Sequence, residues 1–188
     1  NEFMTSQQSS LFINTMMGWP MLPSADLYAG GPAYPLSSLG GRVQYQPTDK
    51  ITMLAGAFAD NPPGGPFDDD SQLRGSSAWG GNFLHLNTGA LLIAELQYAI
   101  NQPSTDKKAP PPAGLPGVYK IGACFDTAGF PDQRYDTADR PLAESNGIAR
   151  TDQSNFSVYA VMDQRIWRPS ADSAQALGVF ARLMGAPG

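Results

Sequence analysis

Seven short stretches of the sequence have the composition of β-strands, and the connections between them largely alternate between long and short. The predicted strands are Phe3–Asn14, Leu39–Gln46, Ile51–Ala59, Ala90–Asn101, Val118–Asp126, Phe156–Trp167 and Leu177–Met184. Connections 47–50, 102–117 and 168–176 are short or medium, whereas connections 60–89 and 127–155 are long. Tight turns at one end of a meander and long loops at the other are typical of an outer-membrane β-barrel. The sequence therefore predicts an all-β, transmembrane, up-and-down antiparallel barrel.

Apolar and polar side chains alternate with a period of two in most of these strands, so each strand has one apolar and one polar face. The apolar phase, expected on the lipid side, consists of Val43, Tyr45, Leu96, Tyr98, Ile121, Phe125, Val158, Val179 and Leu183. The polar phase, expected to face a water-filled lumen, consists of Arg42, Gln44, Glu95, Gln97, Lys120, Asp126, Asp163, Arg165 and Arg182. Ile51–Ala59 is apolar on both phases, so the pattern does not orient it.

Several aromatic residues fall near one end of their predicted strands. Tyr45, Tyr98 and Trp167 precede short or medium connections, and Tyr119 follows one. Aromatic side chains at one level are typical of the girdle that a barrel places at a membrane interface. Ordinary packing between neighbouring strands is the alternative explanation.

Composition narrows the function classes. The net charge is −5 and the 12 basic residues are scattered, which argues against a nucleic-acid surface. A single cysteine, Cys124, can form no internal disulfide, and no zinc-binding spacing is present. The sequence has no apolar run of the ~18 residues needed for a membrane helix, and it opens without a signal peptide. We expect residues 1–188 to be one domain, incomplete at both ends, of a longer exported barrel.

Several longer motifs carry a family resemblance. They are Leu22–Tyr28, Leu39–Asp49, Asp60–Phe67, Glu95–Tyr98, Tyr119–Gly122, Phe130–Asp136, Asn155–Tyr159 and Gly178–Arg182. Nearly end to end and in order, the sequence resembles the carbohydrate-selective porins, the OprB-like family of Gram-negative outer membranes. The resemblance implies a barrel of about sixteen strands, of which this chain would supply about seven.

The resemblance also implies passive, selective diffusion of sugars into the periplasm, without catalysis. We expect no cofactor and no metal. Expected partners are mono- or small oligosaccharides, outer-membrane lipid and lipopolysaccharide, and no nucleic acid. Both a monomer and a homo-oligomer are compatible with the sequence. Mixed charge in the lumen suits neutral, hydroxyl-rich solutes. We further expect Asp26, Tyr28 and Arg134, in the long loops, to close toward the lumen from the outer end.

Two other function classes fit parts of the sequence. A soluble or surface-bound β-sheet carbohydrate-binding module would explain the aromatic and amide residues, but not the one-sided loop lengths. A barrel enzyme would need a nucleophile with a base, and the only histidine is His85. The run Asp68–Asp70 lacks the spacing of a calcium loop and is interpreted as a solvated acidic loop.

Overall fold

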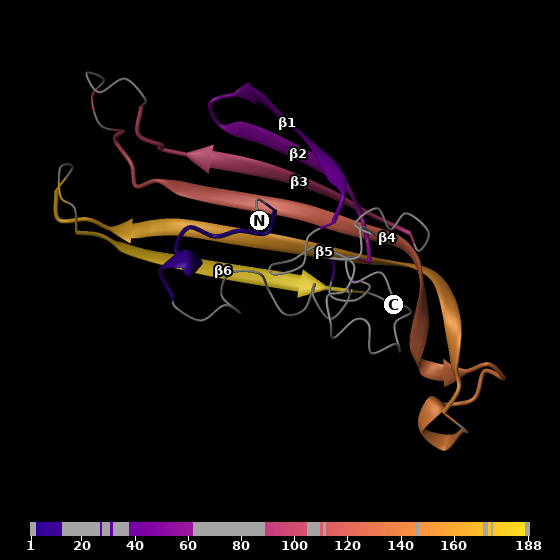
Figure 1. Cartoon of the computed structure of the whole chain (residues 1–188). Helices are drawn as coiled ribbons and strands as arrows, with labels where there is room; N and C mark the ends of the chain where they lie inside the picture. Colours follow the sequence, from indigo (N-terminus) through magenta and orange to yellow (C-terminus); the bar gives the residue numbers. More distant parts are fainter. Residues whose placement is uncertain are drawn as a thin grey trace.

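The chain forms one antiparallel sheet in which every strand pairs with its neighbour in sequence. The computed structural model describes residues 3–12, 27, 31, 38–61, 89–104, 110, 112–145, 147–170, 173 and 175–186. The strands are β1 (Gly40–Thr48), β2 (Ile51–Ala59), β3 (Ala90–Ile100), β4 (Gly117–Asp136), β5 (Ala149–Trp167) and β6 (Leu177–Gly185). Their order in the sheet is β1-β2-β3-β4-β5-β6 (Figure 1), which confirms the predicted all-β meander.

Helical structure is confined, in the described ranges, to two short 3-10 turns, η1 (Ser9–Leu11) and η5 (Leu142–Glu144). None of the helices in that part of the chain has the length and apolar character needed to cross a membrane.

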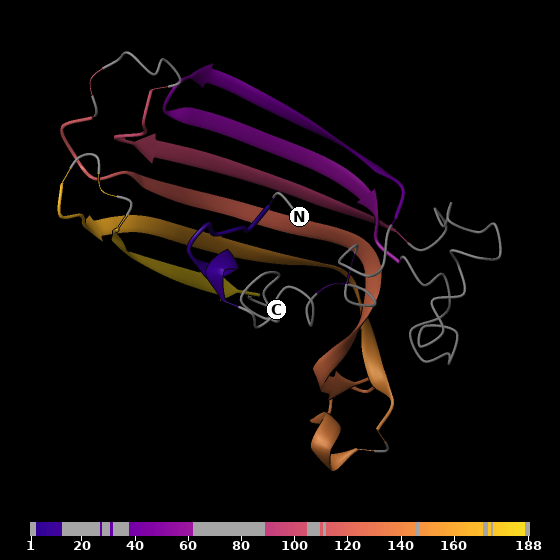
Figure 2. The ribbon, with the colours of Figure 1, turned by 60° about the vertical axis from the view of Figure 1, so that its left-hand side comes forward.

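The first predicted strand, Phe3–Asn14, is wrong for its described residues. Phe3–Phe12, here called the inner segment, forms turns and η1 and lies across one face of the sheet (Figure 2). Its serines bond to their own backbone: the Ser9 N–H donates to Ser6 Oγ (3.0 Å), and Ser10 Oγ donates to the Gln7 carbonyl (2.7 Å). Such local bonds compete with a strand ladder, so the described sheet has six strands rather than seven.

The predicted long loop 127–155 is in large part a hairpin. β4 continues to Asp136 and β5 already begins at Ala149, so both strands extend beyond their neighbours. Register shifts between Asp126 and Gly129, and again between Pro131 and Asp136, interrupt this extension. Glycine and proline in a strand often mark bulges, and they explain why the sequence pattern favoured a loop. The hairpin leaves the sheet at one end (Figure 1).

The predicted alternation of side chains is confirmed. One row of register partners runs through Tyr45, Met53, Leu96, Ile121, Ala160 and Leu183. We call the side that carries this row the open face, and all nine residues of the predicted apolar phase are exposed on it. The opposite side, the covered face, carries Glu95, Lys120 and Arg182. Arg42 lies on the same face, because its register partner Gly56 pairs in turn with the buried Ile93. β2 is now oriented, because Leu54 is buried and Met53 is exposed.

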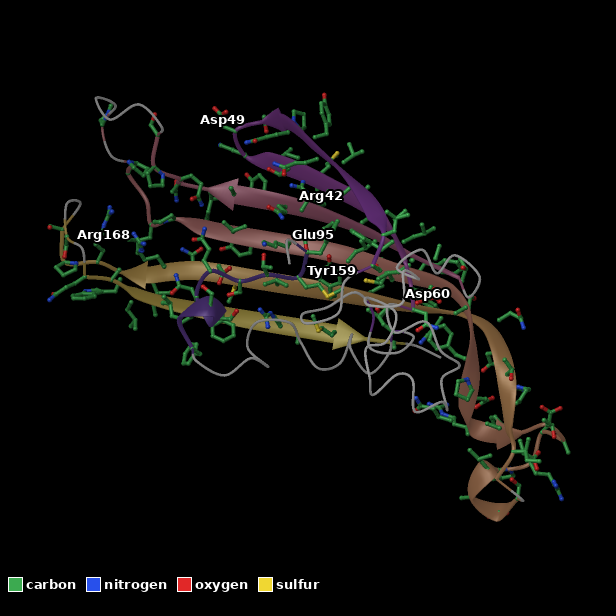
Figure 3. The ribbon with its side chains drawn as sticks, viewed as in Figure 1. Arg42, Asp49, Asp60, Glu95, Tyr159 and Arg168 are labelled. Carbon is green, nitrogen blue, oxygen red and sulfur yellow. The ribbon has the colours of Figure 1, made fainter. Side chains whose placement is uncertain are left out.

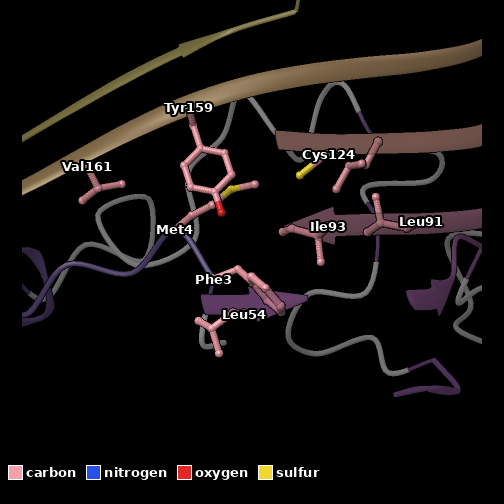
Figure 4. Close-up of a cluster of buried hydrophobic side chains, with 9 residues drawn as sticks. Phe3, Met4, Leu54, Leu91, Ile93, Cys124, Tyr159 and Val161 are labelled. Atoms are coloured by element: carbon pink, nitrogen blue, oxygen red, sulfur yellow. The ribbon is translucent and has the colours of Figure 1, made fainter. Parts of the chain in front are cut away.

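The apolar core lies between the inner segment and the covered face. It comprises Phe3, Met4, Leu27, Leu54, Leu91, Ile93, Cys124, Tyr159 and Val161 (Figure 4). Met4 is fully buried, and the Phe3 ring meets the Phe58 ring edge-on at 6.4 Å between centroids. The inner segment is therefore packed against the sheet through apolar contacts as well as polar ones.

The absence of a side chain at Gly122 makes room for Tyr159. Gly122 lies between Glu95 and Tyr159 in the register of β3, β4 and β5, and the Tyr159 hydroxyl donates to Glu95 across it. A Cβ at Gly122 would lie 2.2 Å from the Tyr159 ring and 2.7 Å from the Ala94 carbonyl oxygen. A larger residue therefore has to displace the tyrosine.

We predict that Gly122→Ala lowers the free energy of unfolding by about 2 kcal/mol, through steric overlap and the loss of a buried hydrogen bond. Urea titration of the protein in detergent measures this change. Gly41→Ala is the matched control, because nothing lies within 4 Å of a Cβ placed at Gly41. Equal stability of the two variants would show that Tyr159 is not held over Gly122.

Candidate solute pathway

A buried carboxylate, Glu95 on β3, is the centre of the polar groups on the covered face. Its side chain accepts hydrogen bonds from the Met4 N–H (2.7 Å), the Tyr159 hydroxyl (2.7 Å) and Gln97 Nε2 (2.6 Å). Lys120 Nζ lies 3.9 Å from Glu95 Oε1. Glu95 is only 3% exposed, and its charge is offset by these donors and the lysine. Figure 3 shows Glu95 and Tyr159 approaching each other from β3 and β5.

A second carboxylate, Asp163 on β5, holds the middle of the inner segment. It accepts from the Ser6 hydroxyl, from the Gln7 N–H at 3.0 Å and from the Gln8 N–H at 3.3 Å. Asp163 is 7% exposed. Three donors on consecutive residues therefore converge on one carboxylate, an arrangement that fixes the backbone of the segment.

Two cations complete the set of polar contacts. Lys120 Nζ donates to Thr5 Oγ1 (3.1 Å), and Arg182 Nη2 donates to Ser9 Oγ (2.8 Å). The structure thus brings together four predicted site residues from four strands, Glu95, Lys120, Asp163 and Arg182, and each contacts the inner segment. Sequence reasoning missed that contact and the role of Tyr159, although Tyr159 falls on the polar phase of its strand.

Of the other predicted pathway residues, Gln97 joins this cluster and the rest lie apart from it. Gln97 bonds to Glu95, whereas Arg42 and Gln44 are exposed on β1, where Arg42 Nη1 donates to Gln44 Oε1 (3.2 Å). Arg165 is half-buried near the short-connection end of the sheet. Asp126 is buried toward the opposite end, where it accepts from the Ala128 N–H (3.0 Å).

The loop residues predicted to form a constriction are placed only in part. Asp26 and Tyr28, together with Asp68–Asp70 and His85, lie outside the described residues. Arg134 is exposed in the hairpin beyond the sheet, where its N–H donates to Asp132 Oδ1 (2.7 Å). Its approach to a lumen stays a prediction.

Charged side chains organise that hairpin. Arg150 contacts three carboxylates, those of Asp132 (2.6 Å), Asp139 (2.7 Å) and Asp152 (3.4 Å). The same guanidinium lies 5.7 Å from the centre of the Tyr135 ring, within the range of a cation–π contact. Hydrogen bonding to Asp139 raises the pKa of Arg150, which is charged at any pH of interest.

Asp136 closes the tip of the hairpin. Its carboxylate accepts from the backbone N–H groups of Arg140 (2.9 Å) and Ala138 (2.8 Å), and from the Arg140 guanidinium (3.0 Å). The Arg140 N–H is the main cause of its lowered pKa. The pKa of Asp132 is lowered as well, chiefly by the backbone N–H of Arg134. Both carboxylates therefore favour the folded hairpin in their ionised form.

Aromatic residues lie at two levels of the open face. Tyr98 and Tyr119 are register partners near the short connections, and Tyr45 and Trp167 are exposed toward the same end of their strands. Phe125 and Phe156 are register partners toward the other end. Tyr98 lies six positions along β3 from Leu92, the register partner of Phe125. This offset corresponds to ~20 Å along a strand. The predicted girdle residues therefore share one face and one end of the sheet.

A family match and a solved structure agree with this architecture. The sequence matches the carbohydrate-selective porin, OprB family, over residues 1–188. The chain therefore belongs to the OprB family of carbohydrate-selective porins. The fold is similar to that of the high-pH structure of Pseudomonas putida OprB, with a TM-score of 0.59 and 24% sequence identity, covering 81% of this chain. The chain spans 32% of the length of that porin. Comparison with curated proteins gave no match.

The hairpin is predicted to loosen in acid. Because the pKa values of Asp132 and Asp136 are lowered in the folded state, their stabilisation is present above the ordinary aspartate pKa of ~4 and is lost as the pH falls below it. Amide hydrogen exchange, corrected for intrinsic rates, should show reduced protection of residues 132–150 at pH 3 relative to pH 6. Asp136→Asn should reduce protection at pH 6 already. Asp49→Asn, in the exposed turn at the opposite end, is the control and should leave the hairpin unchanged.

Proposed function

We propose that this chain is part of the wall of an outer-membrane pore through which sugars diffuse passively and selectively into the periplasm. The observation that carries the proposal is the opposite chemistry of the two faces of one sheet. The open face presents large apolar side chains across all six strands, including Val43, Ile121 and Leu183. The covered face carries the polar cluster around Glu95 and Asp163. A lipid-facing wall with a wet interior requires this division.

Strand length and aromatic placement support a membrane-spanning orientation. β1, β2 and β6 have 9 residues each and β3 has 11, matching the ~9–11 residues of a tilted spanning strand. Tyr98 and Tyr119 at one level, with Phe125 and Phe156 at the other, suit the two interfaces of a bilayer. Outer-membrane lipid and lipopolysaccharide are then the partners of the open face.

A spanning sheet has to close on itself, because lipid cannot satisfy the backbone groups of an edge strand. In the order of the described strands, β1 and β6 are the two edges. We therefore propose that further strands, to a total of about sixteen, pair with both, so that residues 1–188 supply part of one barrel domain. The 32% coverage of the Pseudomonas putida porin supports this size.

Neutral solutes fit the charge pattern of the proposed lumen. The two carboxylates, Glu95 and Asp163, are matched in number by the two cations, Lys120 and Arg182, so the formal charges of the cluster sum to zero. Arg42, Gln44 and Gln97 add donors and acceptors of the kind that sugar hydroxyls bond. Asp126, Arg165 and the loop residues Asp26, Tyr28 and Arg134 are proposed as further contacts along the path. Passive diffusion needs neither a catalytic residue nor a cofactor.

A soluble carbohydrate-binding module fits the same sheet less well. Soluble monomers rarely expose contiguous apolar patches larger than a few hundred Å². Here the apolar rows run from β1 to β6 across the whole open face. In a membrane, lipid would cover this apolar face. In a soluble module, the same face would be exposed to water.

Liposome swelling with the complete barrel that carries residues 1–188 tests the proposal. We expect a neutral monosaccharide to enter faster than an amino acid or an inorganic anion of similar size, with protein-free liposomes as the control. Equal entry of all three would refute sugar selectivity while leaving a pore. No entry of any solute would refute the pore itself.

A further inference from the structure

We propose that the inner segment, Phe3–Phe12, is a selectivity element of the pore that narrows the lumen and covers the charged groups of the wall. This inference rests on the proposed function. It concerns which surface a permeating solute meets. In the proposed arrangement, a permeating solute contacts the uncharged inner segment and does not contact Glu95 or Asp163 directly.

The inner segment crosses the sheet strand by strand, in sequence order. Phe3 packs on Phe58 of β2, and the Met4 N–H bonds to Glu95 of β3. Lys120 of β4 bonds to Thr5, and Asp163 of β5 binds Ser6, Gln7 and Gln8. Ser9 accepts from Arg182 of β6, and the rings of Phe12 and Phe180 lie 5.8 Å apart. The ten-residue segment thus contacts five neighbouring strands and lies across the face of the sheet (Figure 2).

The six hydrogen bonds described above between the segment and the sheet all involve charged side chains of the wall. Two carboxylates and two cations on four strands are engaged by backbone N–H groups, hydroxyls or, for Glu95, also by Tyr159. Hydrogen bonds to charged groups are stronger than those between neutral groups. The number and placement of these bonds argue for a docked segment rather than an incidental contact.

The side of the segment that points away from the wall is uncharged. Phe3–Phe12 contains no Asp, Glu, Lys, Arg or His. Gln7 and Ser10 are exposed, as are Leu11 (77%) and Phe12 (57%). A solute passing the docked segment would meet an amide, a hydroxyl and apolar groups. A neutral sugar can bond to these, whereas an ion loses the attraction of the covered charges.

The test uses two substitutions that weaken docking and one matched control. Ser6→Ala removes the hydroxyl that donates to Asp163 and accepts from the Ser9 N–H. Asp163→Asn removes the charge on the wall side. Ser10→Ala is the control within the same segment, because the Ser10 hydroxyl is exposed and bonds to the Gln7 carbonyl of its own turn. Deletion of residues 3–12 gives the fully undocked state.

Cys124 reports docking independently of transport. It is the only cysteine of this chain and is 2% exposed in the cluster that Phe3 and Met4 cover. We expect a water-soluble maleimide to label Cys124 about tenfold faster in the Ser6→Ala variant, since loss of a hydrogen bond to a charged group shifts docking by at least that factor. Ser10→Ala should label at the unmodified rate. Any cysteine elsewhere in the complete barrel is first replaced.

Planar-bilayer recording supplies the functional readout. If the proposal holds, Ser6→Ala and Asp163→Asn raise the single-channel ion conductance and lower the sugar-over-chloride permeability ratio. Deletion of residues 3–12 changes both quantities several-fold in the same directions. Faster labelling of Cys124 with unchanged conductance and ratio would overturn the proposal and leave the segment a structural strap. Unchanged labelling in both variants would overturn it too. An unmodified protein that conducts no sugar refutes the proposed function instead, so the two failures are distinguishable.

Discussion

The two-residue repeat of the hydrogen-bonded sheet is the constraint on which the rest of the structure depends. Because successive side chains point to opposite faces, one register fixes both surfaces at once. The row through Tyr45, Leu96 and Leu183 gives the open face, and the row shifted by one residue brings Glu95, Gly122 and Tyr159 together beneath the inner segment. A slip of one residue would put carboxylates on the open face and leucines under a polar segment.

Burial of the wall charges follows from the same register. A carboxylate in a low-dielectric site needs donors or a counter-charge. Glu95 and Asp163 obtain donors from a segment more than sixty residues away in sequence, and Tyr159 reaches Glu95 only because Gly122 leaves room. The polar cluster, the close approach at Gly122 and the docking of the inner segment are thus parts of one arrangement.

Much of this fold could be predicted from the sequence, and the exceptions have physical causes. Period-two alternation correctly assigned β1, β3 and β6 and the faces of their side chains, because the pattern is local. It failed for Phe3–Asn14, where serines form bonds within their own turns. It also shortened β4 and β5, because Gly129 and Pro131 resemble loop residues while bulges keep the hairpin paired. Alternation likewise placed Glu95 and Asp163 on the polar face, but their cover by a distant segment depends on long-range contacts that no local pattern encodes.

We propose, above all, that the open face lies in lipid and the covered face lines the pore. Spin labels placed singly at residues 91–98 of β3, in the complete barrel reconstituted into liposomes with Cys124 replaced by alanine, test it most directly. We predict that collision rates with oxygen, which concentrates in the bilayer, alternate with a period of two and are highest at Leu92, Ala94, Leu96 and Tyr98. High accessibility of those four positions to a water-soluble relaxation agent, or the absence of alternation, would contradict it.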